Sequence, residues 1–193
     1  PSVGRVTVDD AKLQNYNRES LGKYIGYLPQ QVEFIPGTIK ENIARMEEKI
    51  DDQKIIQAAK DAGSHKVILD FDKGYDTSLE NLGKNLSAGQ KQRIALARAL
   101  YGDTKLMILD EPNSNLDADG EAALVYALTI AKKKKITTFV ISHRTAILKV
   151  VDKILVMHEG EIQFFDEKNK VLKKLDQMKQ QTLNKLKLLN AQK

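Results

Sequence analysis

Short apolar runs bounded by turn residues recur along the chain and predict strands. Residues 3–8 alternate weakly between apolar and polar side chains, and residues 24–28 form a second short run that Pro29 ends. Residues 106–109 are continuously apolar, which is typical of a strand buried on both faces. Residues 137–141 predict another buried strand, because most of their side chains are β-branched.

Helix start signals lie between these runs. Thr38-x-x-Glu41 has the form of a capping box, so a helix should begin there. Asp51 and Asp52 can cap a second helix, which should end near Gly63 because glycine is common just past a helix terminus. The pattern therefore predicts a helical insert after the second strand.

The middle of the chain carries a longer helical pattern. Residues 64–69 predict a short helix and residues 70–86 a loop. Ser87-x-x-Gln90 is a second capping box, and the helix that it opens should run to about Leu100. Three apolar side chains of this helix share one face for burial: Ile94, Ala97 and Leu100.

The last third of the chain adds helices and a hairpin. An amphipathic helix is predicted over residues 120–135, and strands over 153–157 and 161–165 are joined by a tight turn at 159–160. After Asp166 the chain predicts a helix, and both a surface helix and a coiled coil remain open for it. The leucines at heptad-like spacing are Leu172, Leu175, Leu186 and Leu189. Lys179 and Thr182 interrupt this stripe. This order of elements predicts an α/β fold with a mostly parallel core sheet.

Composition narrows the classes of protein. A length of 193 residues allows one ordinary domain or two small subdomains. A hydrophobic fraction of 41% is enough to bury a core of normal size. The absence of cysteine excludes disulfides and thiolate metal sites, and it is typical of a reducing compartment. The net charge of +5 comes largely from the lysines at 132–135 and the tail after Lys168. No aromatic side chains interleave with these lysines, so we interpret them as solvated surface rather than a nucleic-acid site.

Neither a membrane span nor a targeting signal is expected in this sequence. No apolar run approaches the ~20 residues that a spanning helix needs, and no N-terminal stretch has the pattern of a signal peptide. The sequence starts at Pro1 rather than Met, which predicts a fragment or a processed start.

The apolar run at 106–109 ends in two carboxylates, Asp110 and Glu111. Asp110 would leave the sheet at its carboxyl edge, where ligands of open α/β sheets collect, and could hold Mg²⁺ directly or through water. Glu111 could polarise the water that attacks a γ-phosphate. A pair of helix-capping acids remains the alternative for these two residues.

The helix opened by Ser87 offers a site for an anion. Its free N–H groups and the positive end of its dipole suit a γ-phosphate. Gly89 lowers the helix propensity of the first turn, which favours a close approach of the backbone to a ligand. Ala88 stands where glycine would be more permissive, and its methyl group is tolerated in helical geometry. The alternative is that Ser87 and Gln90 simply start a helix.

Three other side chains follow predicted strands or turns. Residues 114–117 (Ser-Asn-Leu-Asp) predict a turn in which Asp117 caps the next helix. His143 lies just past the strand at 137–141 and could hydrogen-bond a γ-phosphate if that strand is a parallel neighbour of the Asp110 strand. Gln30 is a neutral amide that could contact Mg²⁺ or water.

Two motifs are absent from the sequence. There is no G-x-x-x-x-G-K-[ST], the loop that cradles the phosphates in an ATP site. The sequence therefore offers residues for the metal and the water of such a site, but not for its phosphate loop. There is no G-x-S-x-G around Ser142, so its neighbour His143 does not indicate a Ser-His-Asp hydrolase. His65 and His158 receive no functional interpretation.

In order, these segments resemble the nucleotide-binding domain of ABC transporters. YLPQ, which ends at Gln30, resembles the Q-loop, and LSAGQ at 86–90 resembles the signature motif. LMILDE at 106–111 resembles the Walker B strand, SNLD at 114–117 the D-loop, and ISHR at 141–144 the H-switch. Five motifs in this order and spacing are highly specific.

Longer stretches narrow the resemblance. GYLPQ, LSAGQKQRIALARALYG and ILDEPNSNLD are similar to the type I secretion exporters, most of all to the protease- and RTX-protein-exporting permease/ATPases of Gram-negative bacteria. The resemblance covers about residues 1–170. It implies a P-loop NTPase-like ABC ATPase domain with a helical subdomain, truncated at its N-terminus.

The resemblance also implies boundaries for the parts of this domain. They are an incomplete core subdomain over 1–28 without the phosphate loop, a helical subdomain over 29–100 with the Q-loop and signature, a core subdomain over 101–166 with Walker B, D-loop and H-switch, and a basic helical tail over 167–193.

ATP and Mg²⁺ are the cofactors that the resemblance implies. Asp110 and Gln30 would contact Mg²⁺, Glu111 would be the catalytic base, and His143 would act beside it. The other nucleotide-binding positions would be Ser87, Ala88, Gly89, Gln90 and Asp117, used across a head-to-tail dimer.

Partners and location follow from the same resemblance. They are a second nucleotide-binding domain, an own or partner transmembrane domain, a periplasmic adaptor, an outer-membrane channel and the exported protein, without nucleic acid. The expected location is the cytoplasmic face of the bacterial inner membrane.

Two other classes of protein stay open. A catalytically incompetent ABC-ATPase remnant or regulatory subunit would offer only the signature face, but Gln30, Glu111 and His143 are all intact. The carboxy-terminal half of a chromosome-maintenance ATPase should follow long heptads, whereas a Q-loop strand and a helical insert precede the signature here. We expect the chain by itself neither to bind ATP tightly nor to hydrolyse it, because the phosphate loop supplies most of the contacts.

Overall fold

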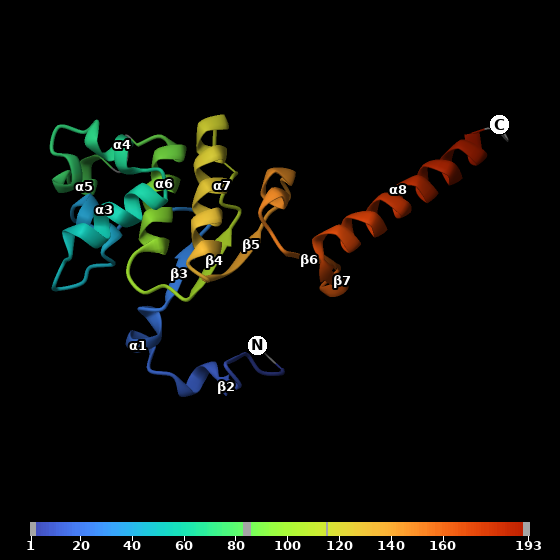
Figure 1. Ribbon diagram of the computed structural model, residues 1–193, viewed down its shortest axis with the longest axis horizontal. Helices are drawn as coiled ribbons and strands as arrows, with labels where there is room; N and C mark the ends of the chain where they lie inside the picture. The colour runs from blue at the N-terminus through green and yellow to red at the C-terminus, as the bar shows by residue number, and fades with distance from the viewer. Residues whose placement is uncertain (1–2, 83–85, 115, 191–193) are drawn as a thin grey trace. The chain divides into compact units, whose positions relative to one another are not determined.

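The computed structural model describes residues 3–82, 86–114 and 116–190, and it leaves the side chains of residues 81–82 and 182–190 undescribed. The chain forms two compact units, Pro1–Arg144 and Thr145–Lys193. The strands of the first unit are β1 (Thr7–Val8), β2 (Ala11–Lys12), β3 (Ile25–Leu28), β4 (Leu106–Asp110) and β5 (Thr137–Ile141). Its helices are η1 (Leu13–Asn15), α1 (Arg18–Gly22), α2 (Ile39–Ile43), α3 (Asp52–Asp61), α4 (His65–Leu69), η2 (Gly74–Asp76), α5 (Leu79–Leu82), α6 (Ala88–Leu100) and α7 (Ala118–Lys133) (Figure 1).

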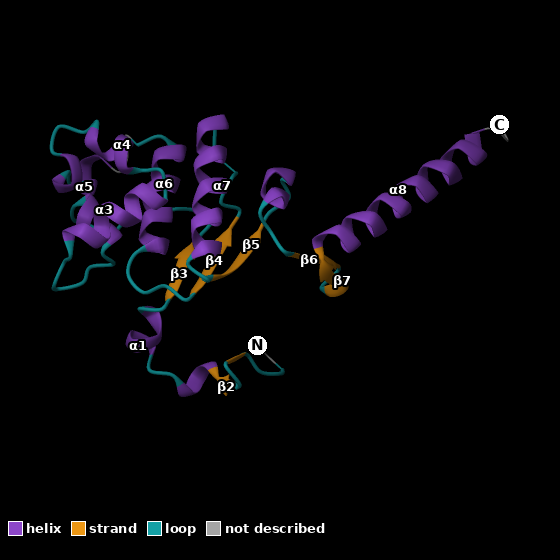
Figure 2. Cartoon of the chain, in the orientation of Figure 1, coloured by secondary structure: helices purple, strands orange, loops and turns teal. Residues whose placement is uncertain are grey.

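A three-stranded parallel sheet forms the centre of the first unit. Its order is β3-β4-β5, so the strand that carries the Asp-Glu pair lies between its two neighbours. Leu28 pairs with Leu109 and Asp110 pairs with Ile141, which places the carboxyl ends of all three strands at one edge. The predicted mostly parallel α/β core is confirmed, and Figure 2 shows these strands beside the helices.

One face of this sheet is covered and the other is open. α6 packs on β3 and α7 packs on β5, and Leu28, Met107 and Leu109 on the covered face are fully buried. On the opposite face Phe139 is 61% exposed and Ile141 is 55% exposed. The prediction that 137–141 is a buried strand is therefore wrong, because β5 is an edge strand of the described sheet with a helix on one side only. β4 likewise alternates between buried and half-buried side chains rather than being buried on both faces.

The predicted helix starts are confirmed at atomic level. The capping box of Thr38 and Glu41 forms at α2, with the Thr38 amide donating to Glu41 Oε2 at 2.6 Å. Asp51 caps α3, accepting hydrogen bonds from Gln53 and Lys54 amides. These contacts are local, which is why the sequence pattern predicted them.

Two predictions near the N-terminus and before α6 need correction. The strand over 3–8 is only β1, which pairs with the short β2. The segment 70–86 is not a plain loop, because η2 and α5 lie in it. Residues 83–85 lie outside the described residues.

The second unit contains η3 (Thr145–Lys149), β6 (Lys153–His158), β7 (Glu161–Glu167) and α8 (Lys168–Asn190). β6 and β7 form an antiparallel hairpin, as predicted. α8 confirms the helical tail, and Lys174 in it lies 5.3 Å from the centre of the Phe164 ring. The side chains of Leu186 and Leu189 lie outside the described residues, so the choice between surface helix and coiled coil stays open.

Among the described residues of both units, none of the helices combines the length and the apolar character needed to span a membrane.

Candidate functional site

The carboxyl edge of the parallel sheet collects the predicted chemistry. Gln30 follows β3 by two residues, Asp110 ends β4, and His143 follows β5 by two residues. Because the three strands are parallel and in register, these side chains reach the same edge. Gln30 is exposed and Asp110 is half-buried. The sheet order, which depends on contacts distant in sequence, brings the three together.

Glu111 and His143 contact each other directly. His143 Nδ1 lies 3.0 Å from Glu111 Oε1. The His143 side chain is 73% exposed and the Glu111 side chain 18% exposed. The Glu111 amide donates to the Ile141 carbonyl at 2.9 Å, which ties the end of β4 to the end of β5. Glu111 has a φ of +46°, a left-handed conformation that is costly for a non-glycine residue and is common at functional sites.

The second carboxylate oxygen of Glu111 has no partner. Oε2 is buried and accepts no hydrogen bond from any described residue. A buried unpaired carboxylate oxygen is unfavourable unless a water or a ligand completes it. Its position therefore suits a group that brings its own hydrogen-bond donor to the edge of the sheet.

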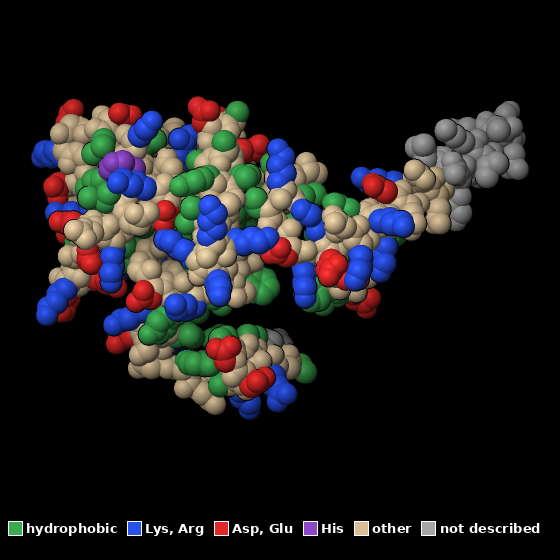
Figure 3. Space-filling view, viewed as in Figure 1, with side chains coloured by type: hydrophobic (Ala, Val, Ile, Leu, Met, Phe, Trp, Pro, Cys, Tyr) green, Lys and Arg blue, Asp and Glu red, His purple; other side chains and the backbone are tan. Residues whose placement is uncertain are grey.

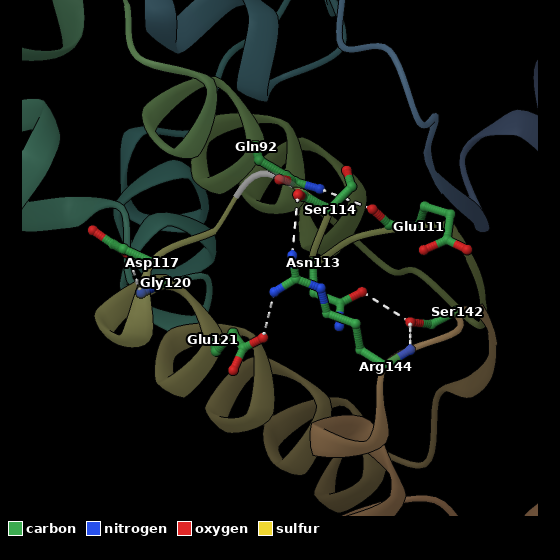
Figure 4. A network of polar contacts seen from close by, with 9 residues as sticks. All are labelled: Gln92, Glu111, Asn113, Ser114, Asp117, Gly120, Glu121, Ser142 and Arg144. Carbon is green, nitrogen blue, oxygen red and sulfur yellow. Dashed lines mark hydrogen bonds and ion pairs between the residues drawn. The ribbon is translucent and has the colours of Figure 1, made fainter.

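A polar network that the sequence did not predict supports this edge (Figure 4). Gln92, on α6, donates from Nε2 to the Glu111 carbonyl at 3.2 Å. Ser142 donates from Oγ to Asn113 Oδ1 at 2.9 Å, and the same Oγ accepts from the Arg144 amide at 3.1 Å. Gln92 and Asn113 are buried polar residues, a sign that only the structure displays. The network links α6, the end of β4 and the end of β5.

Arg144 closes the network on the side of α7. Its guanidinium contacts Glu121 Oε1 at 3.0 Å and the Ser114 carbonyl at 3.4 Å. Arg144 was noted in the sequence only as the last residue of the ISHR motif. Its guanidinium thereby holds the turn after β4 against the start of α7.

The predicted anion site at the start of α6 has the expected cap. Ser87 accepts from the Gln90 amide at 3.2 Å, and the Ser87 amide donates to Gln90 Oε1 at 2.9 Å. Ser87 and Ala88 are exposed, and Gly89 is half-buried. In the described part of the chain no hydrogen bond joins Ser87–Gln90 to Asp110, Glu111 or His143. The structure therefore does not assemble the two groups into one site within this chain.

Asp117 caps α7 as predicted. Its Oδ1 accepts from the Gly120 amide at 2.8 Å and lies 3.2 Å from an Arg93 guanidinium nitrogen. The Asp117 side chain is 71% exposed, which leaves it accessible to a ligand or a partner. Asn115, the second residue of the predicted D-loop, lies outside the described residues.

The donor set at the sheet edge suits Mg²⁺ only together with a phosphate ligand. Among the described residues no cluster of three or more His, Cys, Asp or Glu could hold a metal ion. Mg²⁺ commonly takes one or two carboxylates and completes its shell with waters and substrate phosphates. Asp110 and Gln30 supply oxygen donors of this hard type, so the residues present fit a Mg²⁺–nucleotide complex.

Comparison with known proteins agrees with this geometry. The family model described as ABC transporter matches residues 1–114. The chain belongs to this family. It is 48% identical over 169 residues to the type I secretion system ATP-binding protein PrsD of Rhizobium meliloti (strain 1021), which is 88% of this chain and 29% of PrsD.

Other members of the family have different described roles. The ATP-dependent lipid A-core flippase of Chromohalobacter salexigens is 40% identical over 162 residues, 84% of this chain and 28% of the flippase. The structure of a bacterial Atm1-family ABC exporter with ATP bound superposes with a TM-score of 0.78 at 28% identity, over 89% of this chain and 30% of the exporter. The chain thus spans less than a third of the length of these relatives. The fold is that of an ABC ATPase domain.

Proposed function

We propose that this chain is part of the ATP-hydrolysing domain of an exporter that drives type I protein secretion across the bacterial inner membrane. The observation that carries the proposal is the contact between Glu111 and His143 at the edge where three parallel strands end. The 48% identity with PrsD supports protein secretion over the lipid export of the flippases, which are less similar to this chain.

Glu111 is the general base in this proposal. His143 engages one carboxylate oxygen, and the other is buried without a partner, so it is available to accept a proton from an attacking water. The Glu111 carbonyl accepts from the Gln92 side chain and the Glu111 amide donates to the Ile141 carbonyl, and these two contacts hold the residue in its left-handed conformation. Held in this way, the carboxylate needs no rearrangement before the proton transfer.

Asp110 and Gln30 would hold Mg²⁺, which would neutralise charge on the nucleotide phosphates. Asp117 and the turn of Ser87, Ala88, Gly89 and Gln90 would serve the nucleotide held by a second copy of the domain in a head-to-tail dimer. The exposure of Ser87 and Ala88 supports this assignment. Donors from two chains would then surround the transferring phosphoryl group.

The wider assembly follows from the same proposal. Partners would be a transmembrane domain, in the same or another polypeptide, a periplasmic adaptor, an outer-membrane channel and the exported protein. The domain would lie at the cytoplasmic face of the inner membrane. The residues of this chain alone should bind ATP weakly and not hydrolyse it, so micromolar ATP affinity in calorimetry would contradict that part of the proposal.

The deciding experiment is Glu111→Gln in the complete exporter reconstituted in proteoliposomes. Loss of a general base should lower kcat for ATP by about 100-fold or more while ATP binding persists. Glu48→Gln, an exposed acidic residue away from the sheet edge, is the matched control. Turnover that survives Glu111→Gln would assign the general base elsewhere. A wild-type exporter that binds but never hydrolyses ATP would favour the regulatory alternative.

A further inference from the structure

Arg45, two residues beyond the end of α2, directs its guanidinium at the last turn of α6. Nε donates to the Arg98 carbonyl at 2.9 Å, and Nη2 donates to the carbonyls of Ala99 at 3.1 Å and Tyr101 at 3.2 Å. Carbonyls at a helix C-terminus lack intrahelical partners and carry the negative end of the helix dipole. One cation therefore satisfies three acceptors at the end of the helix that Ser87 begins.

The same guanidinium also holds the approach to β3. Nη1 donates to the carbonyls of Gly22 at 3.0 Å, Lys23 at 3.4 Å and Ile25 at 3.1 Å. Nη2 also donates to the hydroxyl of Thr104, which lies two residues before β4, at 3.0 Å. Arg45 thus bridges the end of α6 to the start of β3 and to the residues just before β4.

The backbone at Arg45 shows that this arrangement is not incidental packing. Arg45 has a φ of +56° and Met46 a φ of +59°, so two successive non-glycine residues are left-handed. Such conformations persist where surrounding contacts over-determine them. Partial burial lowers the pKa of the Arg45 guanidinium, and the set of acceptors that it finds here offsets the loss of hydration.

The segment after Gln30 is attached to the same two helices. Asn42 of α2, which is buried, accepts from the Ile35 amide at 2.9 Å and donates to the Ile35 carbonyl at 2.9 Å. Arg98 of α6 donates to the Glu33 carbonyl at 3.1 Å. The chain between Gln30 and α2 is therefore held from both α2 and α6.

We propose that Arg45 is a positioning residue that locks the C-terminal end of α6 to the start of β3, so that the Ser87 turn and Gln30 move as one body. α6 has 13 residues and spans about 20 Å, so a small tilt at the Arg45 end displaces the Ser87 end. β3 carries Gln30 two residues beyond its end. The lock sets how these two predicted nucleotide contacts lie relative to each other.

Amide hydrogen exchange of the full chain tests the lock directly. In Arg45→Met, which removes every donor but keeps the aliphatic stem, amides of β3 and the last turn of α6 should exchange at least tenfold faster, with α7 unchanged. Lys60→Met, at an exposed position of α3, should leave all of them unchanged. Equal acceleration in α7, or none in β3 and α6, would overturn the proposal. Should Arg45→Met fail to fold, Arg45→Lys supplies the same local comparison, because lysine keeps the charge but not the planar set of donors.

The second test rests on the proposed function. In the complete exporter, Arg45→Met should lower kcat for ATP at least tenfold with KM for ATP within twofold, because Arg45 positions two elements without touching nucleotide. Arg45→Lys should restore part of kcat. A rise in KM with unchanged kcat would overturn the positioning role. A wild-type exporter that does not hydrolyse ATP would contradict the proposed function alone. The amide hydrogen exchange test of Arg45 does not depend on ATP hydrolysis and would still stand.

Discussion

Gly26 lies in β3 where the strand passes closest to α6. A Cβ atom at this position would meet the Ala99 carbonyl oxygen at 2.0 Å, which is far inside van der Waals contact. The partner atom belongs to the backbone, so it cannot move aside without displacing the helix. Gly26 and Arg45 therefore act on the same junction, one by permitting close approach and the other by hydrogen bonding.

Gly26→Ala should destabilise the chain by about 3 kcal/mol, the cost typical of severe overpacking. Gly22→Ala is the matched control, because Gly22 lies in α1 with no atom within 4 Å of the added Cβ. That change should be neutral or stabilising by up to about 1 kcal/mol. Urea denaturation measures both, and equal stabilities for the two variants would contradict the close approach.

Tyr75 makes stability depend on alkaline pH. Burial raises the pKa of Tyr75 to about 12, from an ordinary value of 10.0. The fold thus disfavours the phenolate, and this contribution to stability is complete below pH 10 and is lost as the pH rises from 10 to 12. The free energy of unfolding should fall less steeply over that range in Tyr75→Phe than in wild type. Loss of the hydrogen bond to His65 Nδ1 would add only a constant offset, so parallel curves would refute the assignment.

At the scale of elements, an ion pair joins α3 to the end of α7. Lys134 Nζ lies 2.6 Å from Asp61 Oδ2, and Gln57 Nε2 donates to the other oxygen at 2.8 Å. Asp61 is nearly fully buried, so the interpretation of residues 132–135 as solvated surface is incomplete for Lys134. The sequence of a lysine run does not show which member meets a carboxylate, and the position of α3 decides this for Lys134.

Lys134→Met should destabilise the chain by about 1–2 kcal/mol, because it leaves a buried carboxylate without its cation. The effect stays this small because Lys134 is partly exposed and solvent already weakens the ion pair. Lys133→Met, an exposed neighbour, should change stability by less than about 0.5 kcal/mol. Thermal unfolding of both variants checks this. Indistinguishable midpoints would mean that the pair contributes nothing.

At the scale of the whole molecule, the parallel sheet leaves one apolar face exposed among the described residues. Tyr27 of β3 and Phe139 of β5 flank Ile108 in register, and Tyr27 is 52% and Phe139 61% exposed. Exposed apolar patches of this kind promote association. On the face that Figure 3 shows, Lys and Arg side chains are interspersed with Asp and Glu over α3, α6 and α7.

Phe139→Lys should reduce self-association of the chain in sedimentation velocity and lower the fluorescence of bound ANS. Tyr126→Lys introduces the same charge at a 52% exposed aromatic residue on α7 and should leave both unchanged. Self-association that responds equally to the two substitutions would show that net charge, rather than the sheet face, controls it.

The elements that depend on neighbours in sequence were predictable. Caps at Thr38, Asp51 and Ser87 involve residues two or three positions apart, so the pattern of residues specifies them. The parallel sheet followed from the order of strands and helices, and the family followed from five short motifs. The domain boundaries at 28 and 100 stay predictions, as do the roles of the site residues.

Contacts between distant segments were decided only by the tertiary structure. Glu111 meets His143 because β5 pairs with β4, and it meets Gln92 because α6 packs on the same sheet. Arg45 finds six carbonyls because the C-terminal end of α6 and residues 22–25 both lie beside it. The exposure of β5 likewise depends on what lies on each side of a sheet. By itself the sequence determined the local caps, the succession of strands and helices, and the motifs, since these are properties of nearby residues. Which polar groups meet at the sheet edge depends on long-range packing, which no local pattern encodes.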